Sequence, residues 1–117
     1  MLNMTDGDIH TQIANQLAEK GFAVIKNVLT PEEVKAARLM FDEWRASVPN
    51  LDRQHNIVDP HGIYKHHEVG HQRHAWFVRT RPRVQEIFQK LWDTDELVVS
   101  FDGSCYISHE CRKKDNC

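Results

Sequence analysis

Residues 21–34, GFAVIKNVLTPEEV, decide the fold that we expect, because they place a short strand directly before a strongly marked helix start. The segment 22–26 is apolar, partly β-branched and preceded by a glycine, which predicts a buried strand. Thr30 suits the N-terminal cap, Pro31 suits the first helical position, and Glu33 completes a capping box with Thr30. The chain therefore passes from a strand into a helix at this point.

Helices are also predicted on both sides of this segment. Residues 8–20 carry apolar side chains at helical spacing, and Gly21 follows as a C-terminal cap. The helix that starts after Thr30 should run to about Ala46. Another helix opens at Pro82, and its apolar residues recur at i, i+3, i+4, i+7 and i+8. This tight apolar face comprises Val84, Ile87, Phe88, Leu91 and Trp92.

Residues 61–80, HGIYKHHEVGHQRHAWFVRT, hold five of the eight histidines and fit neither a clean helix nor a clean strand. We expect a long ordered connection, which more often carries binding groups than packing. His67, His71 and His74 would align on a helix face as a metal site does. Gly70 weakens such a helix, so loop histidines bonded to backbone or water are the preferred interpretation.

Residues 97–107, LVVSFDGSCYI, alternate with a period of two, which predicts one long strand. A hairpin that turns at Asp102 and Gly103 is the alternative, and one strand is preferred because the alternation keeps its phase through Gly103. The expected dry face comprises Leu97, Val99, Phe101, Gly103, Cys105 and Ile107. The expected wetter face comprises Val98, Ser100, Asp102, Ser104 and Tyr106.

The composition suits a single domain, 1–117, with one modest core. A formal charge of -2 provides no general field for nucleic acid or an anionic membrane. No apolar run approaches the ~20 residues of a membrane span, and the polar, acidic start does not fit a secretory signal. Three cysteines near the end are an odd number, which favours reduced thiols in a cytoplasmic compartment.

Other ligand patterns are weaker. Cys105, His109, Cys111 and Cys117 could supply a zinc site, but their spacing is unusual and free thiols are preferred. Arginines at 79, 81 and 83 form a basic knot that could meet a carboxylate or phosphate, although a solvated face is preferred. The chain has neither a Gly-x-Ser-x-Gly elbow nor a phosphate-cradling glycine loop.

The order of these segments resembles the N-terminal half of phytanoyl-CoA dioxygenase-like proteins, a family of Fe(II)/2-oxoglutarate oxygenases. GFAVIKNVLTPEEV is similar to the family opening, and the His-rich segment and LVVSFDGSCYI extend the likeness over residues 9–107. The resemblance implies an α+β fold in which helices pack on a double-stranded β-helix, here an incomplete barrel with residues 97–107 as its first core strand. Iron in this family is held by a His-x-Asp pair and a distant His.

The chain contains no His-x-Asp pair. A His66-x-Glu68 pair with His109 can be written instead, but it precedes the first core strand and is disfavoured. The resemblance therefore implies no metal ligand and no catalytic residue here, and Fe(II) and 2-oxoglutarate are not expected to bind stably to this chain alone. It does imply Lys65 as a 2-oxoglutarate contact. Ser100, Asp102, Ser104 and Tyr106 would line the substrate pocket.

The function expected from the resemblance is that of a truncated oxygenase domain without turnover of its own, whose full-length relatives hydroxylate small organic substrates. The alternative is a non-enzymatic metal-binding or protein-interaction module that uses the histidines and terminal cysteines. A first barrel strand without neighbours exposes backbone groups and an apolar face. We therefore expect a marginal or aggregation-prone monomer, or a second chain that completes the sheet.

Overall fold

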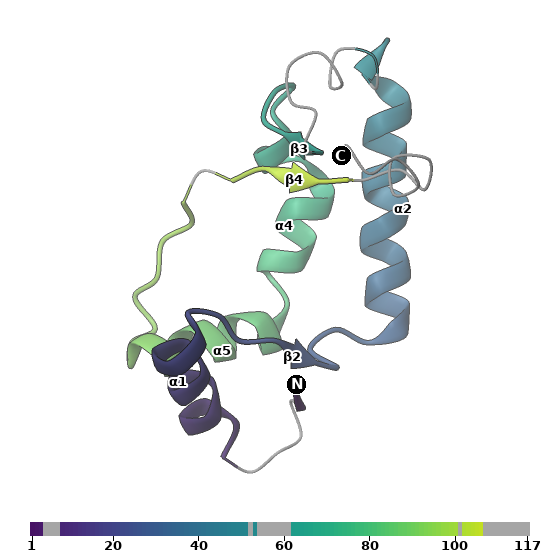
Figure 1. The fold of residues 1–117 in the computed structure, drawn as a ribbon. Helices are drawn as coiled ribbons and strands as arrows, with labels where there is room; N and C mark the ends of the chain where they lie inside the picture. The colour runs from purple at the N-terminus through teal and green to yellow at the C-terminus, as the bar shows by residue number, and fades with distance from the viewer. Residues whose placement is uncertain (4–7, 52, 54–61, 101, 107–117) are drawn as a thin grey trace. The chain divides into compact units, whose positions relative to one another are not determined.

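The computed structural model describes residues 1–3, 8–51, 53, 62–100 and 102–106. It is a mixed α+β chain in which the described residues form helices and two small sheets but no closed barrel (Figure 1). Its elements in order are β1 (Leu2–Asn3), α1 (Ile9–Lys20), β2 (Ile25–Lys26), α2 (Pro31–Ser47), β3 (Ile63–Tyr64), the 3-10 helix η1 (Val69–His71), α4 (Arg73–Arg79), α5 (Pro82–Trp92) and β4 (Ser104–Cys105).

The chain forms two compact units, and neither is continuous in sequence. The first comprises Met1–Ala36 and Phe77–Val99, and the second comprises Ala37–Trp76 and Ser100–Cys117. None of the helices among the described residues combines the length and the apolar composition that a membrane crossing requires.

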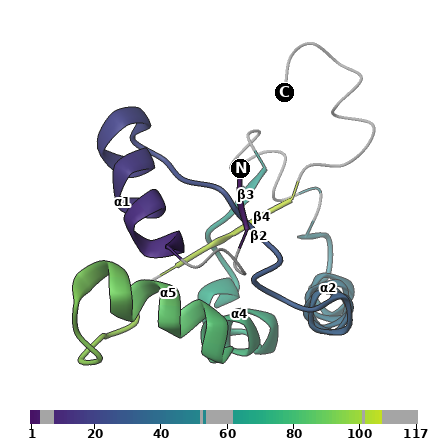
Figure 2. The same cartoon turned by 90° about the horizontal axis from the view of Figure 1, so that it is seen from below.

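In the first unit, α1 and α5 lie side by side in both views (Figures 1 and 2). Ile9 and Ile13 of α1 and Ile87 of α5 form the core with Leu2 of β1. Removing each such side chain from water contributes roughly 1.5–3 kcal/mol. The partly buried residues that pack around this core are Ala23, Ile25, Val28 and Leu91.

Local sequence signals explain where the helices of this unit begin and end. Gly21 adopts a φ of 76° after α1, and its N–H donates to the Leu17 carbonyl at 3.0 Å, as expected of a C-terminal cap. Pro82 opens α5 as expected, and Asp93 closes it in the left-handed region with a φ of 51°. The predicted bounds of α1 and α5 are confirmed.

The predicted capping box at the start of α2 is also confirmed. The Thr30 N–H donates to Glu33 Oε2 at 2.9 Å, and the Glu33 N–H donates to Thr30 Oγ1 at 3.1 Å. The strand before it is shorter than expected. Only Ile25–Lys26 pairs, in parallel with Leu2–Asn3, and Phe22 is exposed. Residues 22–24 include two with a high β-propensity, but β2 pairs with β1 over only two residues.

The second unit has its own core of Trp44, Leu51, Tyr64 and Val69, with Phe41, Val48 and Tyr106 packed against it. Its strands β3 and β4 pair in antiparallel register, with Ile63 opposite Cys105 and Tyr64 opposite Ser104. Side chains of opposed residues share one face of a sheet. The sheet therefore has one face with buried Tyr64 and half-buried Ser104, and another with exposed Ile63 and Cys105.

The long strand predicted over residues 97–107 is wrong. Only Ser104–Cys105 is a strand among its described residues, and Phe101 and Ile107 lie outside the described part. At residues 104–106 the expected faces are also reversed, because Cys105 is exposed whereas Ser104 and Tyr106 are half-buried. Alternation shows which residues share a face, but the pairing with β3 decides which face packs inward.

The His-rich segment is more regular than predicted, because it contains β3, η1 and α4. Gly70 explains part of the difference. It is buried in η1, and a Cβ at this position would overlap the backbone carbonyl oxygen of Asp102. The glycine thus permits a close approach of two backbones instead of marking an irregular loop. The polar, irregular sequence of residues 50–60 predicts a surface loop, but most of these residues lie outside the described part.

Candidate functional site

The strongest candidate site is built around His74, a buried polar side chain that α4 contributes to the second unit. Its Nε2 lies 2.9 Å from Ser104 Oγ of β4, within hydrogen-bonding distance. Because either atom can donate, the tautomer of the ring decides the direction of the bond. The contact joins a helix to a strand that is 30 residues away in sequence.

Aromatic rings surround this histidine. The Phe41 ring meets it edge-on, with centroids 5.1 Å apart at 80°, and the Trp44 ring lies at 5.8 Å. Trp44 in turn meets Tyr64 edge-on at 5.5 Å. Edge-to-face pairs of this kind contribute about 0.5–1.5 kcal/mol beyond their buried area. We call Phe41, Trp44, Tyr64, His74 and Tyr106 the aromatic cluster.

Tyr106 closes the cluster next to β4. Its N–H donates to the Gly62 carbonyl at 2.8 Å, and its ring lies 6.1 Å from that of Phe41. The Arg45 guanidinium carbon lies 3.8 Å from the Tyr106 ring centroid, which is a close cation–π contact. A side chain of α4 therefore contacts Ser104, and side chains of α2 contact Tyr106.

The other residues predicted to line a pocket lie elsewhere. Ser100 and Asp102 are exposed and belong to no regular element. Asp102 Oδ1 accepts a hydrogen bond of 2.7 Å from the Gly103 N–H. Lys65, the predicted 2-oxoglutarate contact, is exposed and follows β3 directly. The structure thus brings Ser104 and Tyr106 to one cluster but does not place Ser100, Asp102 or Lys65 in it.

The histidines that were considered as a metal site are dispersed. His67 is exposed with a φ of 57°, His71 is exposed at the end of η1, and His74 is engaged with Ser104. Over the described ranges, no three His, Cys, Asp or Glu side chains come close enough to hold a metal ion. The described residues therefore do not fit the iron of the resembled family. His109, Cys111 and Cys117 lie outside the described part.

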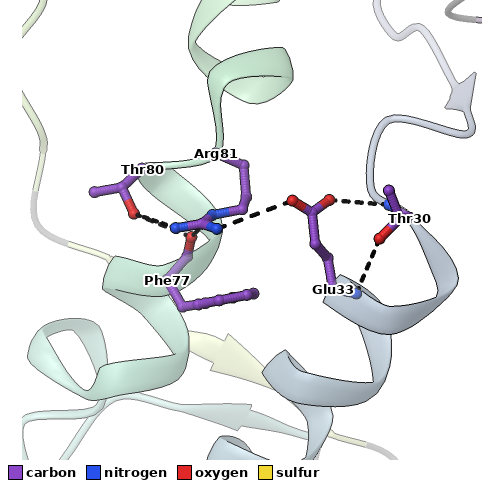
Figure 3. A network of polar contacts seen from close by, with 5 residues as sticks. All are labelled: Thr30, Glu33, Phe77, Thr80 and Arg81. Carbon is purple, nitrogen blue, oxygen red and sulfur yellow. Dashed lines mark hydrogen bonds and ion pairs between the residues drawn. The ribbon is translucent and has the colours of Figure 1, made fainter.

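The basic knot has a structural explanation in the first unit. Arg81 Nε donates to the Phe77 carbonyl at 2.9 Å, and Nη2 donates to Thr80 Oγ1 at 3.3 Å (Figure 3). Its guanidinium carbon lies 4.1 Å from the Phe77 ring centroid. Arg83 Nη1 donates to the Asn27 carbonyl at 3.0 Å. Arg81 is therefore held by several contacts at the turn between α4 and α5, although its side chain is still 28% exposed.

Glu33 extends this network to the start of α2. Its Oε1 lies 3.9 Å from Arg81 Nη1, while its Oε2 caps the Thr30 N–H (Figure 3). One carboxylate thus contacts the corner between α4 and α5 and the first turn of α2. Such a half-exposed ion pair contributes at most about 1 kcal/mol by itself. The more important effect of this Glu33 carboxylate is that it holds the start of α2 next to Arg81, at the turn between α4 and α5.

A shifted pKa occurs at Glu86 on the surface of α5. Lys90 lowers the pKa of Glu86, first through a side-chain hydrogen bond and then through its charge, at 2.9 Å along α5. The Glu86 side chain is about half-exposed, so this shift marks an i, i+4 surface pair on the helix. It does not indicate a reactive carboxyl group.

Sequence reasoning missed the pairing of His74 with Ser104 and the arginine stacked on Tyr106. No local spacing connects residues that are 30 or more positions apart, so neither contact leaves a motif. The only signal was indirect, because Ser104 and Tyr106 were predicted to share one face of a strand. A partner for that face could be identified only after the register of β3 and β4 was known.

Comparison with known proteins gives one informative likeness. No family model matches the chain, and no solved structure matches it. The chain is similar to Ava biosynthesis cluster protein O from Aspergillus versicolor, with 33% identity over 100 residues. The match covers 76% of this chain and 32% of that protein, so the chain spans about a third of the relative's length.

Proposed function

We propose that this chain is the N-terminal portion of a phytanoyl-CoA dioxygenase-like oxygenase and that it has no turnover of its own. In the complete fold, helices would pack outside a double-stranded β-helix, and β4 would belong to its first core strand. Fe(II) and 2-oxoglutarate would be held mainly by residues outside this chain. The substrate class would be small organic molecules.

The observation that carries the proposal is the passage from β2 into α2. The resembled family opens with a strand that delivers the chain into a helix, and here Ile25–Lys26 is followed by a helix that begins at Pro31. The reciprocal hydrogen bonds of Thr30 and Glu33 fix the start of that helix. The opening segment, residues 21–34, therefore forms the strand-to-helix passage that the resemblance implies.

The comparison supports the same proposal from a different direction. The matched segment makes up 32% of a longer protein, so the similar sequence in that relative is accompanied by about twice as much polypeptide. The relative is named for a biosynthesis cluster, which agrees with chemistry on a small molecule. Both points favour a part of an enzyme over a self-contained metal-binding module.

The roles proposed for individual residues are limited. Lys65 stays a proposed contact of 2-oxoglutarate, and Ser100, Asp102, Ser104 and Tyr106 stay proposed pocket residues. Of these, Ser104 and Tyr106 are held by His74 and Arg45, so they would act from a fixed position.

The test compares three proteins: the 117-residue chain, the full-length Aspergillus relative, and a chimera in which this chain replaces the matched third of that relative. Binding of 2-oxoglutarate is measured by calorimetry with Fe(II) under anaerobic conditions, and succinate formation is measured in air. We expect binding by the relative and the chimera, and neither binding nor succinate with the chain alone.

Two results would contradict the proposal. Succinate formed by the chain alone, above an iron-only blank, would show that the centre is complete within it. Absence of 2-oxoglutarate binding by the relative, or by a chimera that melts cooperatively, would show that the resemblance is misleading. Stoichiometric zinc that is lost on Cys111→Ser or Cys117→Ser would instead establish the metal-binding alternative.

A further inference from the structure

Helix α5 buries only part of its apolar face. Ile87 is 8% exposed and packs with Leu91 into the core formed with α1. Phe88 and Trp92, which belong to the same predicted face, are 50% and 67% exposed. The two side chains are four residues apart, so they are neighbours on the helix surface. The apolar stripe of α5 is therefore wider than the core that covers it.

Further exposed apolar residues follow the end of α5 in the sequence. Asp93 turns the chain in the left-handed region, and residues 97–99 then run outside any regular element. Leu97, Val98 and Val99 are all exposed, Val98 to 95%. We call the five residues Phe88, Trp92, Leu97, Val98 and Val99 the 88–99 surface.

Single exposed apolar residues are normal, but this group is unusual. Five large apolar side chains within twelve consecutive positions are a feature of interaction sites or of surfaces covered in a larger fold. An aromatic pair at i, i+4 is also a common anchor where a helix packs on a partner. The i, i+4 pair of Glu86 and Lys90 lies on the opposite side of this helix, so the apolar residues of α5 are confined to one face.

We propose that the 88–99 surface is covered by a polypeptide equivalent to the unmatched two thirds of the Aspergillus relative. The length of that relative favours this occupant, because each copy of the matched segment is accompanied there by about twice its own length of chain. If a second copy of this protein covered the 88–99 surface instead, the additional polypeptide of the relative would have no corresponding surface to pack on. The proposal rests on the proposed function, since both place this chain within a longer fold.

The experiment co-expresses the 117-residue chain with the unmatched remainder of the relative as a separate, tagged polypeptide. We expect the two to co-purify as a 1:1 complex. We also expect Phe88→Ser and Trp92→Ser each to weaken binding at least tenfold, as the loss of a buried aromatic anchor does. Because both side chains are exposed in the free chain, its urea midpoint should change little in either variant.

Leu39→Ser is the matched control. Leu39 is 59% exposed on α2 and belongs to the second unit, so its replacement should leave the affinity unchanged. Three results would overturn the proposal: no complex with the unaltered chain, equal loss in the Leu39→Ser control, or unaltered affinity in both aromatic variants. Self-association of the chain that needs Phe88 and Trp92 would identify a second copy as the occupant instead.

The outcome is separable from the proposed oxygenase function. A complex that forms through Phe88 and Trp92 but binds no 2-oxoglutarate would retain the docking surface and reject the chemistry. If the chimera binds 2-oxoglutarate but the two serine variants have no effect on the complex, the oxygenase proposal is retained and the docking surface is rejected.

Discussion

Removal of the Ser104 hydroxyl tests the centre of the aromatic cluster. Ser104→Ala keeps the Cβ and the strand but deletes the oxygen that lies 2.9 Å from His74 Nε2. His74 is 8% exposed, so the deletion takes a partner from a ring nitrogen with little access to water. A buried polar atom that loses its partner costs about 1–3 kcal/mol.

We therefore expect the free energy of unfolding to fall by about 2 kcal/mol in Ser104→Ala. For a chain of this size, this corresponds to a drop in Tm of roughly 10 °C. Urea unfolding followed by far-ultraviolet circular dichroism measures the change. Ser100→Ala is the control, because Ser100 is exposed outside any element and its replacement should change stability by less than about 0.5 kcal/mol.

A double-mutant cycle with His74→Phe isolates the bond from other effects. The phenyl ring keeps the aromatic packing against Phe41 and Trp44 but cannot bond to Ser104. In this background, Ser104→Ala should cost less by about 1 kcal/mol, which is the coupling energy. Equal cost in both backgrounds, or equal stability of the Ser100 and Ser104 variants, would refute the role assigned to the contact.

Three further predictions concern other parts of the chain. Gly70→Ala should destabilise the protein by about 3 kcal/mol in urea unfolding, because its Cβ would overlap the Asp102 carbonyl and overpacking against backbone is costly; wild-type stability would contradict this close approach. Thr30→Ala should cost about 1 kcal/mol through loss of the cap on α2, and a Thr30→Ser variant that fails to restore stability would contradict the cap. Because Lys90 lowers the pKa of Glu86, the Glu86 carboxylate stabilises the fold above the ordinary glutamate pKa, and this contribution is lost as the pH falls through the lowered pKa. The stability difference between wild type and Glu86→Gln should therefore shrink with acidification across that window; a difference that is independent of pH would exclude it.

The helices were predictable where the signal is local. Gly21 marked the end of α1, Thr30 and Glu33 the start of α2, and Pro82 the start of α5. Each of these residues acts within about four positions of itself, so its effect is visible in a short window of sequence. The short helix α4 was not predicted, because the histidines and Gly70 obscured its apolar spacing.

The strands and the candidate site could not be predicted in the same way. The alternation of residues 97–107 predicted a strand, but a strand needs a partner, and β3 pairs with only Ser104–Cys105. Which face of β4 turns inward depends on Tyr64 and on His74, both far away in sequence. The exposed half of α5 was missed for a similar reason, since its stripe predicts burial and says nothing of what covers it.

The interleaving of the two units bears on synthesis at the ribosome. Each unit combines two segments that are distant in sequence. Ala37–Trp76 can complete its packing only after Ser104 and Tyr106 have been synthesised, and Met1–Ala36 only after Phe77–Val99. At about 5–20 residues per second, the delay between emergence of His74 and of its serine partner is on the order of seconds. During that interval Trp44 and Tyr64 lack their last neighbours, so their aromatic side chains are more exposed in the nascent chain than in the folded protein.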